Sequence, residues 1–264
     1  MANKIVALFL AYKPQLASQA VASFRYHRSA LAGGDTGFDI TPVVVENGEG
    51  DSAQWARDNG VAWMQLPQLS YAKAYNEAVR RLPAMGIEAD WLLLCNDDLA
   101  FSSTTIWDGW LRLMADGNEV IGQKLVYPDG KLQHCGKFFT LDFYPFHPAR
   151  WQPPDEGAAA LDLYCPSVTF ACVLIKRCVW DALGGFDEQF FYGFEDDDFC
   201  LRAKEQGASV VCSNASGVVV HAESQSTGQD TANKDRQWER FRQKWVETRR
   251  INAVLGVWPT WRSK

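Results

Sequence analysis

Apolar runs of strand length alternate with amphipathic segments over about the first hundred residues of the chain. The run from Lys4 to Leu10 is apolar after its first residue, which is typical of a strand buried on both faces of a parallel sheet. Comparable runs follow at residues 40–45, 61–66 and 91–95. Apolar residues at helical spacing predict helices between them, at residues 15–29, 52–59 and 71–82. This alternation predicts βαβ units in an open twisted sheet, and therefore an α/β fold.

Polar residues follow three of these predicted strands. Tyr12 comes after the first strand, Glu46-Asn47-Gly48 after the second and Asn96-Asp97-Asp98 after the fourth. Ligands of open α/β sheets bind at the carboxyl ends of the strands, so these three groups should meet at one edge. The chain has neither a G-x-G-x-x-G nor a G-x-x-x-x-G-K-[ST] motif, which excludes a dinucleotide fingerprint and a P-loop as explanations of that edge.

Two acidic clusters lie next to apolar residues. Asn96-Asp97-Asp98 ends an apolar run, and Glu195 to Asp198 follow the aromatic segment Phe190 to Phe194. Burying part of a carboxylate is costly unless a cation, a proton or hydrogen-bond donors compensate. Mn²⁺ and Mg²⁺ are typically held by one or two carboxylates together with phosphate oxygens of the substrate. The clusters therefore indicate a divalent metal and a general base, which is the pattern of an enzyme.

The second cluster allows two compatible interpretations. Four consecutive acids repel one another and raise the pKa of at least one of them, which favours a base. The same acids would also stabilise the first turn of a helix predicted at residues 198–206 through the helix dipole.

Composition sets limits on the class of protein. With 264 residues and 47% hydrophobic content, the chain can form one large α/β domain or two small ones. It has no apolar stretch of membrane-spanning length and no apolar leader, so cytoplasmic residence is the expectation. Its seven cysteines are odd in number and form no C-x-x-C, which favours reduced core thiols over disulfides or a zinc site.

The C-terminal region differs in charge from the rest of the chain. Although the formal charge is −6, nine Lys and Arg against three acids fall between Lys234 and Lys264. Aromatic and apolar residues at 238, 241, 245 and 246 recur at helical spacing, and Trp258 and Trp261 follow. We divide the chain into a domain at residues 1–224 and a basic, Trp-rich helical extension at residues 225–264. The extension either packs its tryptophans on the body, which we favour, or contacts the inner face of an anionic membrane.

Two polar segments interrupt the regular pattern. Residues 140–164 are rich in proline, and Ser224 to Lys234 has few apolar residues. Long loops beside an active site are often lids, so we expect one or both to become ordered when ligands bind.

The order of several motifs resembles the family 2 glycosyltransferases of the GT-A fold, and among them the rhamnosyltransferase-like bacterial members. The resemblance spans roughly residues 4 to 224 and rests on segments at 43–48, 71–78, 92–98, 122–136, 184–188, 194–202 and 221–224. It implies a Rossmann-like mixed sheet flanked by helices, with the C-terminal helical extension added.

The resemblance also implies a metal and donor site. Asn96-Asp97-Asp98 matches the D-x-D-type element of the family, so Asp98 would bind Mn²⁺ or Mg²⁺ and Asp97 the metal or the donor ribose. Asn96 replaces the first acid, and a neutral amide is a weaker ligand for a hard cation. His221 matches a histidine that completes the metal shell in some members, although a lone histidine at a strand end is often only a polar surface residue.

Further donor residues follow from the same comparison. Tyr12 would either stack on the base or close the sheet edge as a surface aromatic, and Glu46 would lie near the nucleotide. Lys73 and Asn76 match the family's N-x-G-type element loosely and would bind the donor, with Lys73 near the diphosphate. Trp180 and the aromatics at 190–192 would either stack on a sugar ring or pack in the core, and we expect core packing for at least half of them.

For the acceptor side, Glu195-Asp196 matches the E-D element of the family. Asp196 would be the general base that takes the proton from the attacking hydroxyl, and Glu195 would contact the acceptor or orient the segment. Asp197 or Asp198 would then serve the helix.

The sequence thus predicts an inverting, metal-assisted transfer of a sugar from a nucleotide-diphosphate donor, dTDP-rhamnose or a UDP-sugar. The acceptor would be a hydroxyl of a cell-surface polysaccharide or a lipid-linked glycan. A non-catalytic carbohydrate-binding protein or a degenerate transferase is the alternative. A nucleotidyltransferase is disfavoured because no glycine-rich basic loop follows the first strand, and nucleic-acid binding because the body is acidic.

Overall fold

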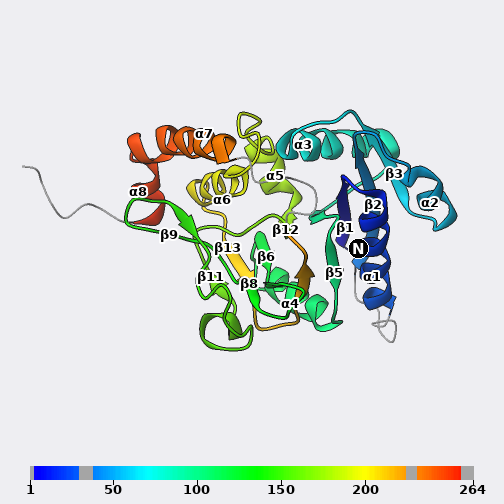
Figure 1. The fold of residues 1–264 in the computed structure, drawn as a ribbon, viewed down its shortest axis with the longest axis horizontal. Coiled ribbons are helices and arrows are strands. Elements are labelled where there is room, and N and C mark those ends of the chain that lie inside the picture. Colours follow the sequence, from blue (N-terminus) through cyan, green and yellow to red (C-terminus); the bar gives the residue numbers. More distant parts are fainter. Residues whose placement is uncertain (1–2, 30–37, 224–230, 257–264) are drawn as a thin grey trace, which may run out of the picture.

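A computed structural model describes residues 3–29, 38–223 and 231–256 of the chain. Its main sheet has eight strands (Figure 1). From one edge to the other these are β11 (Leu163–Tyr164), β13 (Val210–Ser213), β6 (Val120–Gln123), β12 (Cys172–Lys176), β4 (Trp91–Asn96), β1 (Asn3–Ala11), β2 (Phe38–Asn47) and β3 (Ala62–Leu66). The strands β3, β2, β1 and β4 run parallel, whereas β12 is antiparallel to both β4 and β6. The sheet is therefore mixed, as the resemblance implied.

A second sheet of four short strands lies next to the end of β4. It has the order β5 (Leu99–Phe101), β14 (Val219–His221), β7 (Leu125–Val126) and β8 (Leu132–His134). Because β5 follows β4 after a two-residue turn, this sheet begins where the first acidic cluster lies. A hairpin of β9 (Phe138–Phe139) and β10 (Pro145–Phe146) follows in the chain.

Helices cover both faces of the main sheet. They are α1 (Pro14–Ser29), α2 (Ser52–Asp58), α3 (Tyr71–Arg81), α4 (Thr105–Ala115), α5 (Arg177–Leu183), α6 (Glu195–Glu205), α7 (Thr231–Phe241) and α8 (Arg250–Leu255). Two 3₁₀ turns, η1 (Leu82–Met85) and η2 (Gly157–Ala160), and a π-helical segment, η3 (Arg242–Glu247), complete the elements.

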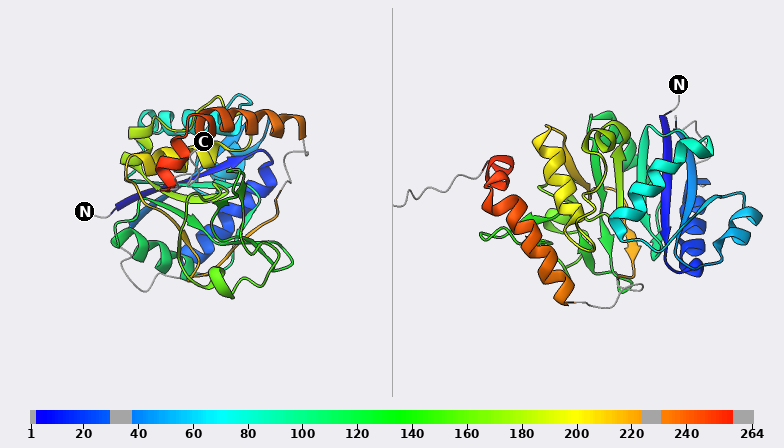
Figure 2. Two further views of the ribbon diagram at one scale, coloured as in Figure 1. Left: turned by 90° about the vertical axis from the view of Figure 1, so that its left-hand side faces the viewer. Right: turned by 90° about the horizontal axis from the view of Figure 1, so that it is seen from above.

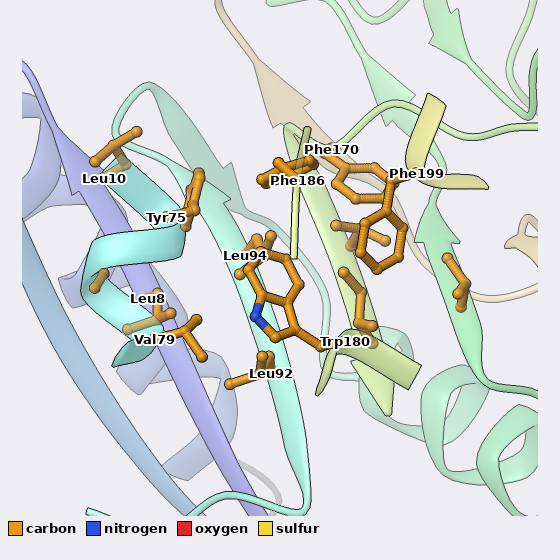
Figure 3. Packing of buried hydrophobic residues seen from close by; sticks show 14 of the residues in the cluster. Leu8, Leu10, Tyr75, Val79, Leu92, Leu94, Phe170, Trp180, Phe186 and Phe199 are labelled. Carbon is orange, nitrogen blue, oxygen red and sulfur yellow. The ribbon is translucent and has the colours of Figure 1, made fainter. Parts of the chain in front are cut away.

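The pleat of β1 divides the core into two layers. Val6, Leu8 and Leu10 pack with α3, α5 and α6 on one face, while the residues between them pack with α1, α2 and α4 on the other. Figure 3 shows the first layer, where Trp180 lies beside Leu92 and Leu94 of β4 and Phe199 packs next to Phe170. Every residue from Ile5 to Ala11 is buried, which confirms the prediction of a strand covered on both faces.

The C-terminal helices share a core with the body. Phe241, Trp245 and Ile251 are fully buried against Phe190 and Leu201, and α8 contacts α6. Figure 2 shows α7 and α8 beside α6 at one end of the molecule. The predicted helical extension is therefore present and packs its described tryptophans on the body. Trp258 and Trp261 lie outside the described residues, as does most of the predicted lid from Ser224 to Lys234.

Two predicted boundaries differ from the structure. The helix expected at residues 198–206 begins at Glu195, because all four acids occupy its first turn. Residues 140–164 contain β10, η2 and β11 rather than one irregular loop. Their main anchors are non-local contacts, such as the bonds from the buried Lys124 Nζ to the carbonyls of Pro154 and Ala159, both 3.0 Å long. Such contacts leave no periodic pattern in the sequence.

Candidate active site

The first acidic cluster lies where the order of the parallel strands reverses. The chain runs from β1 outward to β2 and β3 and then returns to β4 on the other side of β1, which is the topological switch point where open α/β sheets bind ligands. Asp97 bridges the two sides, since its Oδ2 accepts bonds from the backbone nitrogens of Tyr12 and Lys13, both 2.8 Å long. Burial raises the pKa of Asp97, and these two backbone bonds oppose that effect.

Asp98 and His221 form a pair beside this point. His221 Nε2 lies 3.1 Å from Asp98 Oδ1, and Asn96 Nδ2 lies 3.3 Å from the same ring nitrogen. The other ring nitrogen, Nδ1, is 2.7 Å from Oε1 of the buried Gln133. An amide oxygen only accepts, so Nδ1 is the donor of this bond, and Nε2, the ring nitrogen that faces Asp98, is the one that would bind a metal in the neutral imidazole.

This pair supplies a carboxylate and an imidazole, which suit Mn²⁺ or Mg²⁺ when phosphate oxygens complete the shell. A hydrogen-bonded partner behind a ligating histidine is also the usual arrangement at metal sites. Within residues 3–29, 38–223 and 231–256, no group of three or more His, Cys, Asp or Glu is arranged to hold a metal ion. The donor set therefore fits a metal that the substrate helps to bind, rather than a closed site built from protein alone.

Of the residues predicted to bind the nucleotide, some lie at the same sheet edge as this pair and others lie on α3. Glu46 is buried at the end of β2, and its Oε2 accepts the backbone N–H of Ser52 at 2.8 Å. A Cβ on Gly50 would lie 1.6 Å from Glu46 Oε1, so a larger residue there would have to displace the Glu46 carboxylate. The structure thus brings Tyr12, Glu46 and Asp97 to one edge, as predicted.

Lys73 and Asn76 lie on the helix α3 and not at the end of a strand. Lys73 is exposed in the first turn of α3. The amide of Asn76 bonds the backbone of Phe186, with its nitrogen 3.0 Å from the carbonyl oxygen and its oxygen 2.9 Å from the amide nitrogen. Asn76 therefore ties α3 to the turn that precedes the second acidic cluster.

The second acidic cluster surrounds a buried lysine. Lys137 Nζ lies 2.9 Å from Asp196 Oδ2 and 2.8 Å from Asp197 Oδ2. Ser167 Oγ donates to the other oxygen of Asp197 at 2.7 Å. Burial lowers the pKa of Lys137, but the charges of Asp196 and Asp197 outweigh it and the net shift is upward. Lys137 is therefore a cation in the folded protein, and Asp196 is the member of this group with the greater exposure.

Glu195 stands apart from this ion pair. Burial and the charge of Asp196 raise the pKa of Glu195 to about 8, so its carboxyl group is mostly protonated at neutral pH. Its Oε2 is buried and lacks a hydrogen-bond partner among the residues that the structure describes. The residue before it, Phe194, has a φ of 69°, an uncommon conformation for a non-glycine residue. The turn into α6 thus presents a neutral carboxyl group beside a charged one.

Asp198 serves the fold instead. It is completely buried and bonds Arg202 Nε at 2.8 Å, Trp245 Nε1 at 2.8 Å and Lys244 Nζ at 2.7 Å. These contacts fasten the C-terminal helices to the helix that begins with Glu195. They agree with the expectation that Asp197 or Asp198 serves the helix.

Tyr12 connects the two acidic clusters electrostatically. Burial raises the pKa of Tyr12 to about 12, and the charges of both Asp97 and Glu195 add to this effect. The clusters, about a hundred residues apart in the sequence, thus act on one side chain. Of the aromatics near α6, Trp180 and Phe190 are buried in the core, whereas Phe191 and Tyr192 are exposed.

Lys137, Gln133 and Ser167 were not found by the sequence analysis. Lys137 follows Gly136 and precedes two phenylalanines, and a single cation in such a setting is a signal of a buried ion pair. Gln133 and Ser167 carry no comparable signal, because their roles arise only from contacts with His221 and Asp197.

The described helices contain none that is both long and apolar enough to cross a membrane.

Comparison with known proteins gives relatives in sequence. No family model matches the chain. Over 183 residues, 66% of the chain, it is 31% identical to the O-antigen biosynthesis protein RfbC of Myxococcus xanthus. Over 216 residues, 73% of the chain, it is 26% identical to N-acetylglucosaminyl-diphospho-decaprenol L-rhamnosyltransferase of Mycobacterium tuberculosis. The chain spans 14% of the first of these proteins and 70% of the second.

Solved structures agree on the fold. GalNAc-T7 with UDP, GalNAc and Mn²⁺ matches 93% of the chain, and 49% of its own length, with a TM-score of 0.63 at 12% identity. The mannosyltransferase PcManGT from Pyrobaculum calidifontis, in complex with GDP-Man and Mn²⁺, matches 84% of the chain and 57% of its own length, with a TM-score of 0.55 at 13% identity. Both are GT-A structures, which confirms the predicted fold class. The comparisons therefore support a glycosyltransferase with the GT-A fold, whose relatives in sequence are named for O-antigen biosynthesis and rhamnosyl transfer.

Proposed function

We propose that this chain transfers a sugar from a nucleotide-diphosphate donor to a hydroxyl group of a glycan, with inversion at the anomeric carbon. The observation that carries the proposal is that a GT-A fold holds two different carboxylate sites, and that Asp97 of the first and Glu195 of the second both act on Tyr12 at the end of β1. One site is the Asp98–His221 pair, and the other is formed by the consecutive residues Glu195 and Asp196 at the start of α6. dTDP-rhamnose is the first candidate donor because two relatives are named for O-antigen biosynthesis and rhamnosyl transfer, and UDP-sugars come next.

The donor would bind across the ends of β1, β2 and β4. Tyr12 and Glu46 would contact the nucleoside and Asp97 the ribose. Asp98 and His221 would hold Mn²⁺ or Mg²⁺, with Gln133 fixing the histidine ring. The bound metal would neutralise the charge that develops on the departing nucleotide diphosphate.

The acceptor would be activated at the second cluster. Asp196 would take the proton from the attacking hydroxyl, and the ammonium of Lys137, 2.9 Å from its Oδ2, would hold the carboxylate in position. Glu195, protonated at neutral pH, would donate a hydrogen bond to an acceptor oxygen from its buried position. The cluster thus offers one proton acceptor and one proton donor on adjacent residues.

The acceptor class is part of the proposal. A cell-surface polysaccharide or a lipid-linked glycan suits the names of the relatives. The described part of the C-terminal extension gives no support for a membrane contact, because Phe241 and Trp245 are buried against the body. Contact through residues 257–264 and a cytoplasmic location both stay predictions.

A donor panel tests this function. The protein is incubated with dTDP-, UDP- and GDP-sugars with and without Mn²⁺ or Mg²⁺, and thermal stability and nucleotide release are followed. We expect metal-dependent stabilisation by one nucleotide, lost in Asp98→Ala but retained without turnover in Asp196→Ala. If no nucleotide sugar in the panel stabilises the protein or releases its nucleotide, the result would contradict the proposal and favour a carbohydrate-binding protein or a degenerate transferase.

A further inference from the structure

An exposed tryptophan stacks on a buried tyrosine at the edge of the small sheet. The rings of Trp151 and Tyr127 are almost parallel, at 5°, with their centroids 4.1 Å apart. Tyr127 is buried, whereas Trp151 is 55% exposed. The stack therefore has one side supported by the protein and an indole on the other side that is open to solvent.

Polar contacts hold this stack in place. Arg150 donates to the hydroxyl oxygen of Tyr127 and to both carboxylate oxygens of Glu223, the latter at 2.9 and 2.7 Å. Its guanidinium carbon lies 5.5 Å from the Tyr127 ring centroid and 5.3 Å from that of Trp151. The backbone N–H of Trp151 donates to the carbonyl of Leu132 at 2.8 Å. Both the ring and the main chain of Trp151 are thus fixed.

The backbone at this place is strained. Trp151 has a φ of 73° and Ala149 a φ of 54°, a region that residues with a Cβ rarely adopt. Such strain persists only where surrounding contacts enforce it, and it gathers at functional sites. A single exposed aromatic residue needs no explanation on its own. A strained and hydrogen-bonded backbone that keeps an indole out of the core does need one.

The strand register places the stack beside the proposed metal pair. β7 runs parallel to β14, with Val126 opposite Val220, so Tyr127 comes next to His221. Glu223 follows two residues after His221, and the N–H of Ala222 donates to the carbonyl of Asp98. In the main sheet, β2 and β1 lie on one side of β4, and Glu46 and Tyr12 stand at their ends. In the small sheet, β14 with His221 lies between β5, which follows β4, and β7, which leads to Tyr127. The stack is therefore next to the metal pair on the strand that continues away from β5.

We propose that Trp151, supported by Tyr127, is a subsite for one pyranose ring of the acceptor glycan. This inference rests on the proposed function, which puts the donor at the β1–β2 end. The apolar face of a sugar ring fits a flat indole, and the partly exposed Arg150 and Glu223 beside it offer a donor and an acceptor for hydroxyl groups.

Fluorine NMR tests the subsite directly. The chain has eleven tryptophans, so total fluorescence would not single out one of them. Protein labelled with 5-fluorotryptophan gives separate resonances, and comparison with Trp151→Phe assigns that of Trp151. The probes are the methyl pyranosides of rhamnose, N-acetylglucosamine, glucose and galactose, added with and without nucleotide diphosphate and Mn²⁺. We expect at least one of them to shift the Trp151 resonance and to leave that of Trp55, on α2, unchanged.

Two variants separate binding from folding. Trp151→Gly removes the indole and also relieves the positive φ, so the fold should be retained. With a sugar that binds, its half-saturation should rise about tenfold, whereas Trp151→Phe should recover most of the affinity. Binding is followed in these variants by saturation-transfer NMR on the sugar.

The subsite would be overturned if none of the sugars shifts the Trp151 resonance. It would also be overturned if Trp151→Gly binds the sugar as tightly as the parent protein does. Stabilisation by nucleotide and metal is measured on the same samples. If no sugar binds at Trp151 but nucleotide and metal still stabilise the protein, the subsite is wrong and the proposed function is retained. Failure of the stabilisation with a sugar-dependent shift at Trp151 would overturn the function and retain a sugar site.

Discussion

The buried ammonium of Lys137 separates the roles of three neighbouring acids. It pairs with Asp196 and Asp197 and leaves Glu195 without a counter-ion. Burial raises the pKa of Asp197 to about 6 even with Lys137 beside it, so the group depends on this cation to stay ionised. A buried charge that loses its partner is strongly destabilising, whereas the intact pair is close to neutral in stability. We therefore predict that Lys137 affects chemistry as well as folding.

Lys137→Met tests this role. Without the opposite charge, the carboxylate forms of its neighbours become less favourable, so the acid limb of the pH–rate profile should move to higher pH. At neutral pH we expect kcat to fall about tenfold, while nucleotide affinity stays the same. Lys244→Met is the matched control, because Lys244 pairs with Asp198, another acid in the first turn of α6, and with Asp187 before that helix. An unchanged profile in Lys137→Met would show that Lys137 serves only the fold.

Gln133→Leu tests the support behind His221. The substitution keeps the volume but leaves Nδ1 without its acceptor, so the ring is free to change tautomer and orientation. Loss of such a partner typically lowers metal affinity by about tenfold to a hundredfold. The affinity for Mn²⁺ is measured by titration in the presence of the stabilising nucleotide. Gln123→Leu, which removes an equally buried amide bonded to the Gly217 carbonyl, should leave that affinity unchanged.

At the scale of elements, the C-terminal helices support the helix that carries the acid cluster. Trp245 is fully buried and donates to Asp198, which lies on the turn that also holds Asp196. Sequence periodicity predicted this packing, because aromatic residues at helical spacing mark the buried face of a helix. The register of the supporting contacts was not predictable, since Asp198, Lys244 and Trp245 meet only after the chain has folded.

Trp245→Ala should lower the free energy of unfolding by about 3–5 kcal/mol, since it leaves a large cavity in the core that α6 shares with the extension. It also removes one donor from a buried carboxylate. Trp245→Phe keeps most of the volume, so it isolates the lost hydrogen bond at about 1–3 kcal/mol. Urea unfolding measures both. Equal and small effects would mean that the extension adds little to the stability of the body.

The first four strands and the polar residues at their ends were the most predictable features of the whole molecule. Apolar runs such as Ile5 to Leu10 have to be covered on both faces, and this alone fixes an α/β sheet with Tyr12 and Asp97 at one edge. The roles of Lys137 and Gln133 were not predicted, because their partners are distant in sequence. The short strands of residues 140–164 were not predicted either, because contacts such as those of Lys124 and Arg150 hold them.

The pH dependence of stability reports on the protonated state of Glu195. Its pKa is about 8 in the folded protein against an ordinary value of 4.5, so between these values the folded protein holds a proton that the unfolded chain has released. Stability contributed by this proton is therefore lost as the pH rises, with a slope of at most about 1.4 kcal/mol per pH unit. His147 acts in the opposite direction at lower pH, because burial lowers its pKa to about 3 and the unfolded chain takes up the proton first.

Glu195→Gln removes the titrating group but keeps the size of the side chain. The variant should gain stability relative to the parent as the pH rises from about 5 to about 8. The His147 contribution, which falls between its pKa of about 3 and its ordinary value of 6.5, should be the same in both proteins. Urea unfolding of both proteins across this range gives the two slopes. Glu205→Gln, at the other end of α6 where the carboxylate bonds Arg250 near the surface, is the control. Parallel curves for Glu195→Gln and its parent would mean that Glu195 is ionised in the folded protein, and Asp196 would then have no neutral neighbour to donate to the acceptor.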